Sequence, residues 1–279
     1  MPSMNLISKI PKPFAFSQSS LQDYADCARR FQLRYLEQLR WPAVESEPIQ
    51  DNEKHLIEGQ LFHRLVQQHL LGLPSEKLSL LANTSDLERW WENYMSTDLG
   101  INDYAKYTEL SLSCPLGNHR LLAKYDLIAI KPGEKALIID WKTYAKHPRD
   151  EWMAARWQTR VYRALLAMAG AHLNNNVPIE PEQIEMMYWY ADFPTKPARF
   201  SYDTNQFKRD WAAIQKIVSE VSGEGIFPLT QDEQSCRFCT YRSYCERGEQ
   251  AGSIDEGEGE LDSDSSFDIN FEQIGEIEF

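Results

Sequence analysis

The sequence predicts an α/β fold in which a mixed central β-sheet is flanked by helices. Two observations support this prediction. Short runs rich in branched apolar residues, at 119–130, 136–142 and 183–193, have the length and composition of buried strands. Segments 58–74 and 205–222 instead repeat apolar residues at helical spacing. Strands and helices therefore alternate along the chain, which is the pattern of α/β proteins.

Length and composition set limits on the class of protein. The chain has 279 residues, of which 42% are hydrophobic, enough for one sizeable core. It contains no apolar stretch of about eighteen residues, and its first residues lack the apolar segment of a signal peptide. We therefore expect a cytoplasmic protein. In that reducing compartment, five cysteines are not expected to form a disulfide framework.

The negative charge is concentrated at the carboxyl end. Residues 251–279 contain ten acidic side chains and no basic one. Without these ten charges, the formal net charge of −13 becomes −3. A body this close to neutrality can still present a basic groove, so the overall charge does not exclude nucleic acid as a partner.

Residues 17–39 are predicted to form one helix, with Ser20 and Asp23 as a capping box. Its core-facing side chains would be Leu21, Tyr24, Phe31 and Tyr35. Cys27 lies in the middle of this helix. A single helical cysteine commonly serves as a small buried hydrophobe, and that alternative stays open here.

A loop at 40–56 is followed by the helix at 58–74, which Gly72 and Pro74 end. His63 falls on its apolar face, where a core histidine is the simplest interpretation. Residues 75–106 are predicted to be helical and rich in aromatic residues. We interpret these rings as packing residues, although aromatic rings also stack on single-stranded bases.

The strand at 107–116 turns at Gly117 and Asn118 into the strand at 119–130, which contains Asp126. The turn at 131–134 then leads to the strand that contains Asp140 and Lys142, so the last two strands should form a hairpin. Side chains two apart in a strand share a face, which places Asp140 with Lys142, and Asp126 with Lys124, Ile128 and Ile130. In the hairpin, Asp126 should lie opposite residues 139–141.

The convergence of two aspartates and a lysine points to chemistry on phosphate. Two carboxylates can hold Mg²⁺ or Mn²⁺, and a lysine can orient a water or stabilise charge that builds on phosphorus. The alternative is a strand that emerges into solvent with two ordinary surface charges. Burial of the side chains distinguishes the two interpretations, because a buried charge needs a partner or a metal and a surface charge does not.

A helix is predicted from Pro148 to about residue 169, and it places Gln158 and Tyr162 on one face. An exposed glutamine and a half-buried tyrosine would be the ordinary explanation of that pair. Strands at 183–193 and 198–203 should pair with each other. The amphipathic helix at 205–222 follows them.

Three cysteines lie within ten residues, Cys236, Cys239 and Cys245. Four thiolates suit either zinc or an iron–sulfur cluster, and Cys27 is the natural fourth ligand. The spacing does not choose between zinc and iron, and unlinked thiols are the remaining alternative. Such a link would join the N-terminal and C-terminal helical segments.

Asp126 followed by Asp140-x-Lys142 resembles the active-site signature of the PD-(D/E)XK nucleases. The RecB-like branch of that family, which includes recombination helicase-nuclease domains and CRISPR-adaptation exonucleases, is similar over about residues 17–247. The shared motifs arrive in family order: Cys27, Gly59-x-x-x-His63, Asp126, Asp140-x-Lys142, Gln158-x-x-x-Tyr162, then Cys236, Cys239 and Cys245. Ala28, Ala123 and Lys124 depart from the residues that this branch often has.

The resemblance implies a restriction-endonuclease-like fold and a Mg²⁺- or Mn²⁺-dependent deoxyribonuclease, which by analogy alone would act as an exonuclease. It implies that His63, Asp126, Asp140 and the Trp141 carbonyl bind the metal. Lys142 would activate the water, and a glutamine and a tyrosine, here Gln158 and Tyr162, would order that lysine or touch DNA. The catalytic set is Asp126, Asp140, Lys142, Gln158 and Tyr162.

The resemblance also favours a [4Fe-4S] cluster over zinc on Cys27, Cys236, Cys239 and Cys245. The partners implied are DNA with a free or single-stranded end, in repair, recombination or CRISPR adaptation. The chain lacks a GxxxxGK[ST] phosphate loop, so helicase activity would come from another chain. Two rival hypotheses are a non-catalytic DNA-end or partner-binding module of this fold, and a zinc-stapled scaffold without a DNA role.

We expect one nuclease domain over residues 1–249 and an acidic, disordered tail over 250–279. The tail alternates acids with Phe and Ile near its end. It is either a solvated segment that keeps the protein soluble or one that docks on a protein partner or in the DNA groove.

Overall fold

The computed structural model describes residues 10–39, 49–223, 226–236 and 239–248, with only the backbone for 49–53. The predicted tail at 250–279 and residues 40–48 of the predicted loop lie outside these residues. The loop prediction was wrong for residues 49–56, which are helical. No helix in the described ranges is long and apolar enough to cross a bilayer.

The centre of the molecule is a six-stranded mixed sheet in the order β1-β3-β4-β5-β6, with β2 on β3. The strands are β1 (Ala15–Phe16), β2 (Ala105–Leu116), β3 (His119–Lys131), β4 (Lys135–Lys142), β5 (Ile184–Tyr190) and β6 (Ala198–Ser201). The β1–β3 and β4–β5 pairs are parallel, and the others are antiparallel. The predicted hairpin of β3 and β4 is confirmed, as is the mixed sheet.

Strand β3 has two different neighbours along one edge. Strand β2 pairs along nearly its whole length, so β1 and β4 must share the other edge. The β4 pairing ends at Leu127, and β1 pairs only at Arg120 and Leu121. The β3 edge between these two partners therefore forms a fork, and Asp126 lies at the point where β4 leaves.

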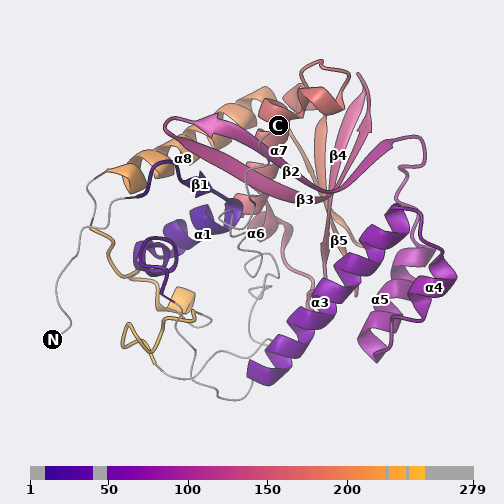
Figure 1. Ribbon diagram of the computed structural model, residues 1–279, viewed down its shortest axis with the longest axis horizontal. Helices are drawn as coiled ribbons and strands as arrows, with labels where there is room; N and C mark the ends of the chain where they lie inside the picture. Colours follow the sequence, from indigo (N-terminus) through magenta and orange to yellow (C-terminus); the bar gives the residue numbers. More distant parts are fainter. Residues whose placement is uncertain (1–9, 40–48, 224–225, 237–238, 249–279) are drawn as a thin grey trace, which may run out of the picture.

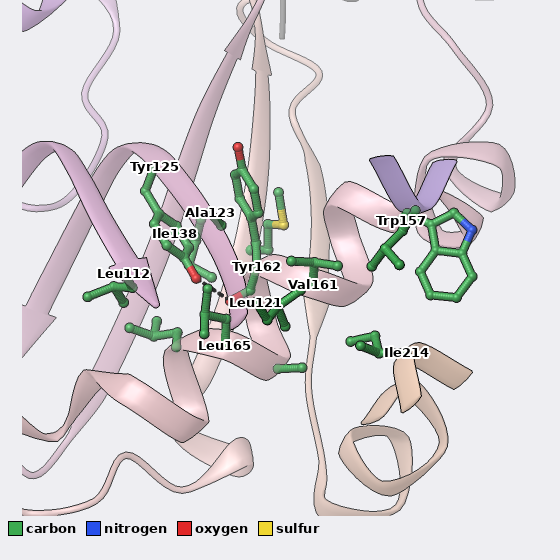
Figure 2. Packing of buried hydrophobic residues seen from close by; sticks show 14 of the residues in the cluster. Leu112, Leu121, Ala123, Tyr125, Ile138, Trp157, Val161, Tyr162, Leu165 and Ile214 are labelled. Carbon is green, nitrogen blue, oxygen red and sulfur yellow. Dashed lines mark hydrogen bonds between the residues drawn. The ribbon is translucent and has the colours of Figure 1, made fainter. Parts of the chain in front are cut away.

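One face of the sheet is covered by α1 (Gln18–Asp26), α7 (Trp157–Ala169) and α8 (Thr204–Ser222), whose apolar residues join the larger core cluster. Figure 2 shows Val161, Tyr162 and Leu165 of α7 against strand residues, with Ile214 of α8 beside them. The second face is covered by α3 (Ile49–Leu70), α4 (Ser75–Ser79) and α5 (Ser85–Ser96), seen together in Figure 1. The predicted α/β fold, with helices flanking the central sheet, is confirmed.

The predicted helix at 17–39 is divided into three pieces: α1, α2 (Ala28–Phe31) and the π-helical η1 (Gln32–Leu36). It breaks at Cys27, which has extended backbone angles, φ −160° and ψ 108°. The predicted cap was also wrong, because the capping box joins Ser17 and Ser20. Asp23 is unavailable for capping, since it pairs with Arg30 at 2.7 Å and Arg34 at 3.2 Å.

The predicted helix from Pro148 is two helices, α6 (Asp150–Ala155) and α7, separated at Arg156. Arg156 has ψ 144°, which is outside the helical range. Three short 3₁₀ turns complete the described elements: η2 (Gly170–Leu173), η3 (Pro181–Gln183) and η4 (Glu233–Cys236).

His119 joins β1, β3 and α8 through both ring nitrogens. Its Nδ1 accepts the Phe14 N–H at 3.2 Å, and its Nε2 lies 3.1 Å from Ser222 Oγ. Burial, together with the charge of Lys12, lowers the pKa of His119. The ring must therefore be neutral in the folded protein to accept from Phe14.

We expect acid to weaken this junction. Because the folded pKa is below that of the unfolded chain, the unfolded state takes up the proton first, and the free energy of unfolding falls as pH drops below about 6.5. His119→Gln, which can accept and donate but does not titrate here, should flatten that dependence between about pH 7 and 5. Urea unfolding at several pH values measures it, and an unchanged pH slope in the variant would contradict it.

Candidate active site

The two candidate aspartates lie at the open end of the β3–β4 hairpin. The last pair in the ladder is Leu127 with Ile139, so Asp126 and Asp140 occupy the next positions across the two strands. This agrees with the predicted placement of Asp126 opposite residues 139–141. The hairpin thus brings both aspartates to the fork in the β3 edge.

Asp140 is buried and held from two sides. Its side chain is 1% exposed, and its Oδ2 lies 3.0 Å from the Nζ of Lys142, which is 2% exposed. The Gln158 side-chain amide donates to Asp140 Oδ1 at 2.8 Å, and Tyr188 O–H donates to Gln158 Oε1 at 3.2 Å. The prediction that Asp140 and Lys142 project together is confirmed. The alternative of two surface charges is wrong for this pair.

Asp126 has a different set of partners. Its Oδ2 accepts the Trp141 N–H at 2.9 Å and lies 3.3 Å from His63 Nδ1 of α3. Burial opposes ionisation of Asp126, but His63, the Trp141 N–H and the Lys142 charge outweigh it and lower the pKa of Asp126. The carboxylate form is therefore the one that these neighbours favour. His63 faces Asp126 rather than filling the core.

A change in strand alternation directs Asp126 toward α3. Tyr125 and Ile128 both belong to the core cluster on the α7 side, although they are three residues apart, whereas Leu127 belongs to the cluster on the α3 side. In a regular strand, residues three apart would face opposite sides. The expectation that Asp126 shares a face with Ile128 and Ile130 is therefore wrong.

Strand β2 shows the same irregularity opposite Asp126. Tyr107 and Leu110 both pack on the α7 side, and Glu109 between them has a left-handed φ of 53°. The ladder pairs Thr108 and Leu110 with β3 but leaves out Glu109. Its carboxylate lies 2.5 Å from Lys124 Nζ. Irregularities of this kind re-aim side chains beside functional sites, and here the re-aimed residue is Asp126.

Gly59 allows α3 to approach the end of β4. A Cβ at this position would lie 2.9 Å from Thr143 Oγ1, closer than real Cβ atoms come to other atoms. His63 is one helical turn further along α3. The glycine in Gly59-x-x-x-His63 therefore has a physical role, because it lets the helix come close enough for His63 to reach Asp126.

Tyr162 joins α7 to β3. Its O–H donates to Lys124 O at 2.7 Å, its ring lies 4.6 Å from that of Tyr125, and its carbonyl accepts the Tyr125 O–H at 2.9 Å. Figure 2 shows these two tyrosines and the hydrogen bond between them. Gln158 and Tyr162 share a face of α7 as expected. Gln158 contacts Asp140, and Tyr162 braces the strand that carries Asp126.

The four candidate cluster cysteines come from both ends of the described chain into one neighbourhood. The pKa of the Cys245 thiol is raised to about 11, chiefly by burial and then by the negative charge of Cys239, Cys27 and Cys236. Cys27 acts on the pKa of Cys236 and of Cys239 in the same direction. Cys114 lies apart in the core, with its pKa raised by burial to about 11.

Two hydrogen bonds hold the cysteine-bearing segments together. The Tyr241 O–H donates to Leu39 O at 2.8 Å, and the Arg29 N–H donates to Pro228 O at 3.1 Å. Cys27 itself caps α2 without a side-chain hydrogen bond. The interpretation of Cys27 as a residue inside a continuous helix is wrong, because the helix breaks there.

No set of three or more His, Cys, Asp or Glu in the described ranges is arranged so that it could hold a metal ion. In this arrangement His63 and Asp126 form one pair, while Asp140 is paired with Lys142. The predicted four-cysteine cluster is likewise not formed as a metal-binding group. The residues of both predicted sites are neighbours, but their ligand atoms are not assembled.

Comparison with known proteins decides the family. A family model described as the PD-(D/E)XK nuclease superfamily matches residues 15–113 and 84–246. The chain belongs to the PD-(D/E)XK nuclease superfamily. Its match spans every element from β1 to the third cysteine of the C-terminal group. Membership supports a nuclease-type function for this chain.

Two solved structures resemble this PD-(D/E)XK chain at low sequence identity. SSO0001 is 12% identical, with 86% of this chain and 89% of that chain covered and a TM-score of 0.39. A candidate exonuclease from Eubacterium rectale is 11% identical, with 78% and 86% covered and a TM-score of 0.46. No curated protein matches the chain.

Two residues around the PD-(D/E)XK signature were not anticipated from the sequence. Tyr188 of β5 reaches Gln158, and its O–H lies 2.8 Å from Thr159 Oγ1, so it completes the buried network behind Asp140. The parallel pairing of β5 with β4 places Tyr188 beside Asp140. Sequence patterns predict only an apolar strand at this position, and the order of strands in a sheet cannot be predicted from one strand.

Proposed function

We propose that this chain is a metal-dependent deoxyribonuclease of the RecB-like branch of the PD-(D/E)XK superfamily. The observation that carries the proposal is the pair of aspartates opposite each other at the end of the β3–β4 hairpin, with Lys142 buried beside one of them. Burying two carboxylates and a lysine costs free energy unless these charges pair with each other or bind a metal ion. Hydrolysis of a phosphodiester is the reaction that such a set suits.

Asp126, Asp140, His63 and the carbonyl of Trp141 are the groups that we propose to bind Mg²⁺ or Mn²⁺. The donor set fits a hard divalent cation, because it consists of carboxylate and carbonyl oxygens with one imidazole. The bound ion would polarise the phosphate and help to ionise a water. In the structure, Asp140 is paired with Lys142 and Asp126 with His63.

Lys142 would act on the attacking water or on the phosphate. Its ammonium lies near the rings of Tyr144 and Tyr188, at 5.8 and 5.6 Å from their centroids. These rings limit its freedom and exclude water from its stem. The Lys142 charge would stabilise the negative charge that develops on the phosphate oxygens. Gln158 fixes the orientation of Asp140, and Tyr162 fixes β3.

We further propose a [4Fe-4S] cluster on Cys27, Cys236, Cys239 and Cys245, with zinc as the less favoured metal. Four thiols fit either group chemically. The positions of the cysteines support this proposal. Residues 27 and 236 are far apart in sequence, but they lie on segments joined by the Tyr241–Leu39 and Arg29–Pro228 hydrogen bonds. A staple there would fix the N-terminal helices beside the C-terminal segment.

The proposed substrate is DNA with a free or single-stranded end, cut as an exonuclease in repair, recombination or CRISPR adaptation, in the cytoplasm. The acidic tail at 250–279 would add a protein-docking segment. Pull-down with the full chain, compared with a chain that ends at residue 249, tests the tail separately from the enzyme.

The decisive experiment is a cleavage assay on anaerobically purified protein. End-labelled single-stranded and duplex DNA are incubated with Mn²⁺, Mg²⁺ or EDTA. We expect cleavage that requires the divalent ion and is lost in Asp126→Asn. DNA binding without cleavage under all these conditions would instead favour a non-catalytic end-binding module. Absence of both, with zinc as the only bound metal, would favour a scaffold.

A further inference from the structure

The connection from β4 to α7 has the opposite charge balance to the rest of the chain. Residues 146–160, called the basic connection below, contain four cations and two carboxylates, whereas the chain as a whole carries −13. The cations are Lys146, Arg149, Arg156 and Arg160. Lys146 and Arg149 are exposed, and the two other arginines are half-buried. In Figure 1, the helix of this connection, α6, lies between α1 and α3.

Both ends of the basic connection are attached to the candidate active site. Lys142, four residues before its start, pairs with Asp140, and Gln158 near its end donates to the same carboxylate. The Thr159 hydroxyl also donates to Met153 O at 2.6 Å, which ties α6 to α7. The connection therefore has a fixed place beside Asp140, independent of any bound ion.

Two arginines of the basic connection lie over tryptophan rings. Arg156 Cζ is 4.8 Å from the ring centroid of Trp152, and Arg160 Cζ is 5.2 Å from that of Trp157. The break between α6 and α7 occurs at Arg156, which places its side chain back over the helix before it. Trp152 is half-buried and Trp157 is buried, so each indole is anchored in the core on its other side.

The ordinary explanation is that these arginines cover apolar surface, as long cationic side chains often do. Another arginine in the structure illustrates that use. Arg163 lies 4.4 Å over Tyr202 but is fully buried and faces Asp210, so it has no access to a ligand. Arg156 differs because it is half-exposed and because Lys146 and Arg149 of the same connection are exposed cations, whereas Arg160 lies 3.9 Å from Asp210.

We propose that the basic connection binds single-stranded DNA next to the active site, with Arg156 on Trp152 as a platform on which an unpaired base stacks. This inference rests on the proposed nuclease function. Guanidinium planes and indoles stack on exposed bases without regard to sequence, and the surrounding cations contact phosphates. Bases in a duplex are already stacked and paired, so duplex DNA gains only the phosphate contacts.

Fluorescence anisotropy of labelled DNA with the full-length protein tests the proposed stacking. The measurement is made in EDTA, which prevents metal-dependent cleavage of the probe. The probes are a labelled single strand, the same strand in a duplex, and an abasic strand of equal length. Arg156→Lys keeps the charge but removes the plane, and Trp152→Leu removes the ring while it keeps an apolar side chain. We expect each to weaken binding of the single strand about tenfold, a typical value for one lost base stack, and to leave abasic binding unchanged.

Matched controls come from α8, where Arg209 is exposed and Trp211 stacks on Phe207 with a centroid distance of 6.3 Å. Arg209→Lys and Trp211→Leu should bind the single strand as the wild type does. Thermal unfolding checks that each variant is folded. If Trp152→Leu is not folded, Arg156→Lys alone tests the proposal. Wild-type affinity in Arg156→Lys, equal losses on the abasic strand, or no binding of single strands by the wild type would each overturn the proposal.

The proposed chemistry can fail without this proposal failing. Stacking-dependent binding together with no Mn²⁺-dependent cleavage would refute the nuclease and leave the platform in place. Cleavage that persists in Arg156→Lys with unchanged single-strand affinity would refute the stacking platform and leave the proposed nuclease in place.

Discussion

Asp140→Asn is expected to abolish Mn²⁺-dependent cleavage and also to destabilise the fold. Asparagine keeps the shape of the side chain but removes the charge that both the ion and Lys142 use. We expect the cleavage rate to fall at least about a hundredfold, as when one charge-stabilising group is lost from an active site. Because Lys142 would be left buried without its partner 3.0 Å away, the free energy of unfolding should fall by about 3 kcal/mol.

The double variant Asp140→Asn/Lys142→Met separates these two effects. Methionine fills the volume of the lysine stem without a charge, so it should restore much of the lost stability while the enzyme stays inactive. Urea unfolding of the four proteins in the cycle gives the coupling energy of the pair, which we expect to be about 2 kcal/mol. Restored activity in the double variant, or additive stability losses, would contradict the assignment.

A matched control for Asp140 is the buried Asp210, which pairs with Arg163 on α7 at 3.7 Å. Asp210→Asn removes a carboxylate from a buried cation in the same way, but outside the candidate site. It should lower the free energy of unfolding and leave cleavage per folded molecule unchanged. Loss of cleavage in this control would show that any destabilisation inactivates the enzyme.

The sequence was sufficient to predict the strands of the hairpin and the position of Asp126 across from residues 139–141. Both follow from local patterns, namely two branched apolar runs and a short turn. The face of Asp126 could not be predicted in the same way. Its direction depends on the paired irregularity at Glu109 and on the approach of α3 at Gly59, and both arise from contacts between distant segments.

The partners of Asp140 illustrate the same limit. The sequence placed Lys142 on the face of Asp140, because that relation needs only the period of a strand. The buried contacts with Gln158 and Tyr188 depend on the packing of α7 on the sheet and on the parallel placement of β5. The break at Cys27 was also hidden, since residues 18–36 have a helical pattern and nothing local marks the position where the chain turns.

The second large effect is expected at the cysteines. In Cys27→Ser, the anaerobically purified protein should lose the broad visible absorption of an iron–sulfur cluster and unfold at lower urea. A link between residues 27 and 236 closes a loop of about 210 residues, so its loss could cost up to about 5 kcal/mol on the loop-entropy view. Cys236→Ser, Cys239→Ser and Cys245→Ser should behave alike, because a four-thiolate site fails when any ligand is removed.

Cys114→Ala is the matched control, since Cys114 is buried in the core and takes no part in the group. It should keep the colour, with the small loss of stability typical of a core cysteine. A brown and active Cys27→Ser protein would refute the proposed ligand set. A colourless wild type with one bound zinc would keep the staple and replace its metal, because the tie between the two ends of the fold depends on four thiolates and not on iron.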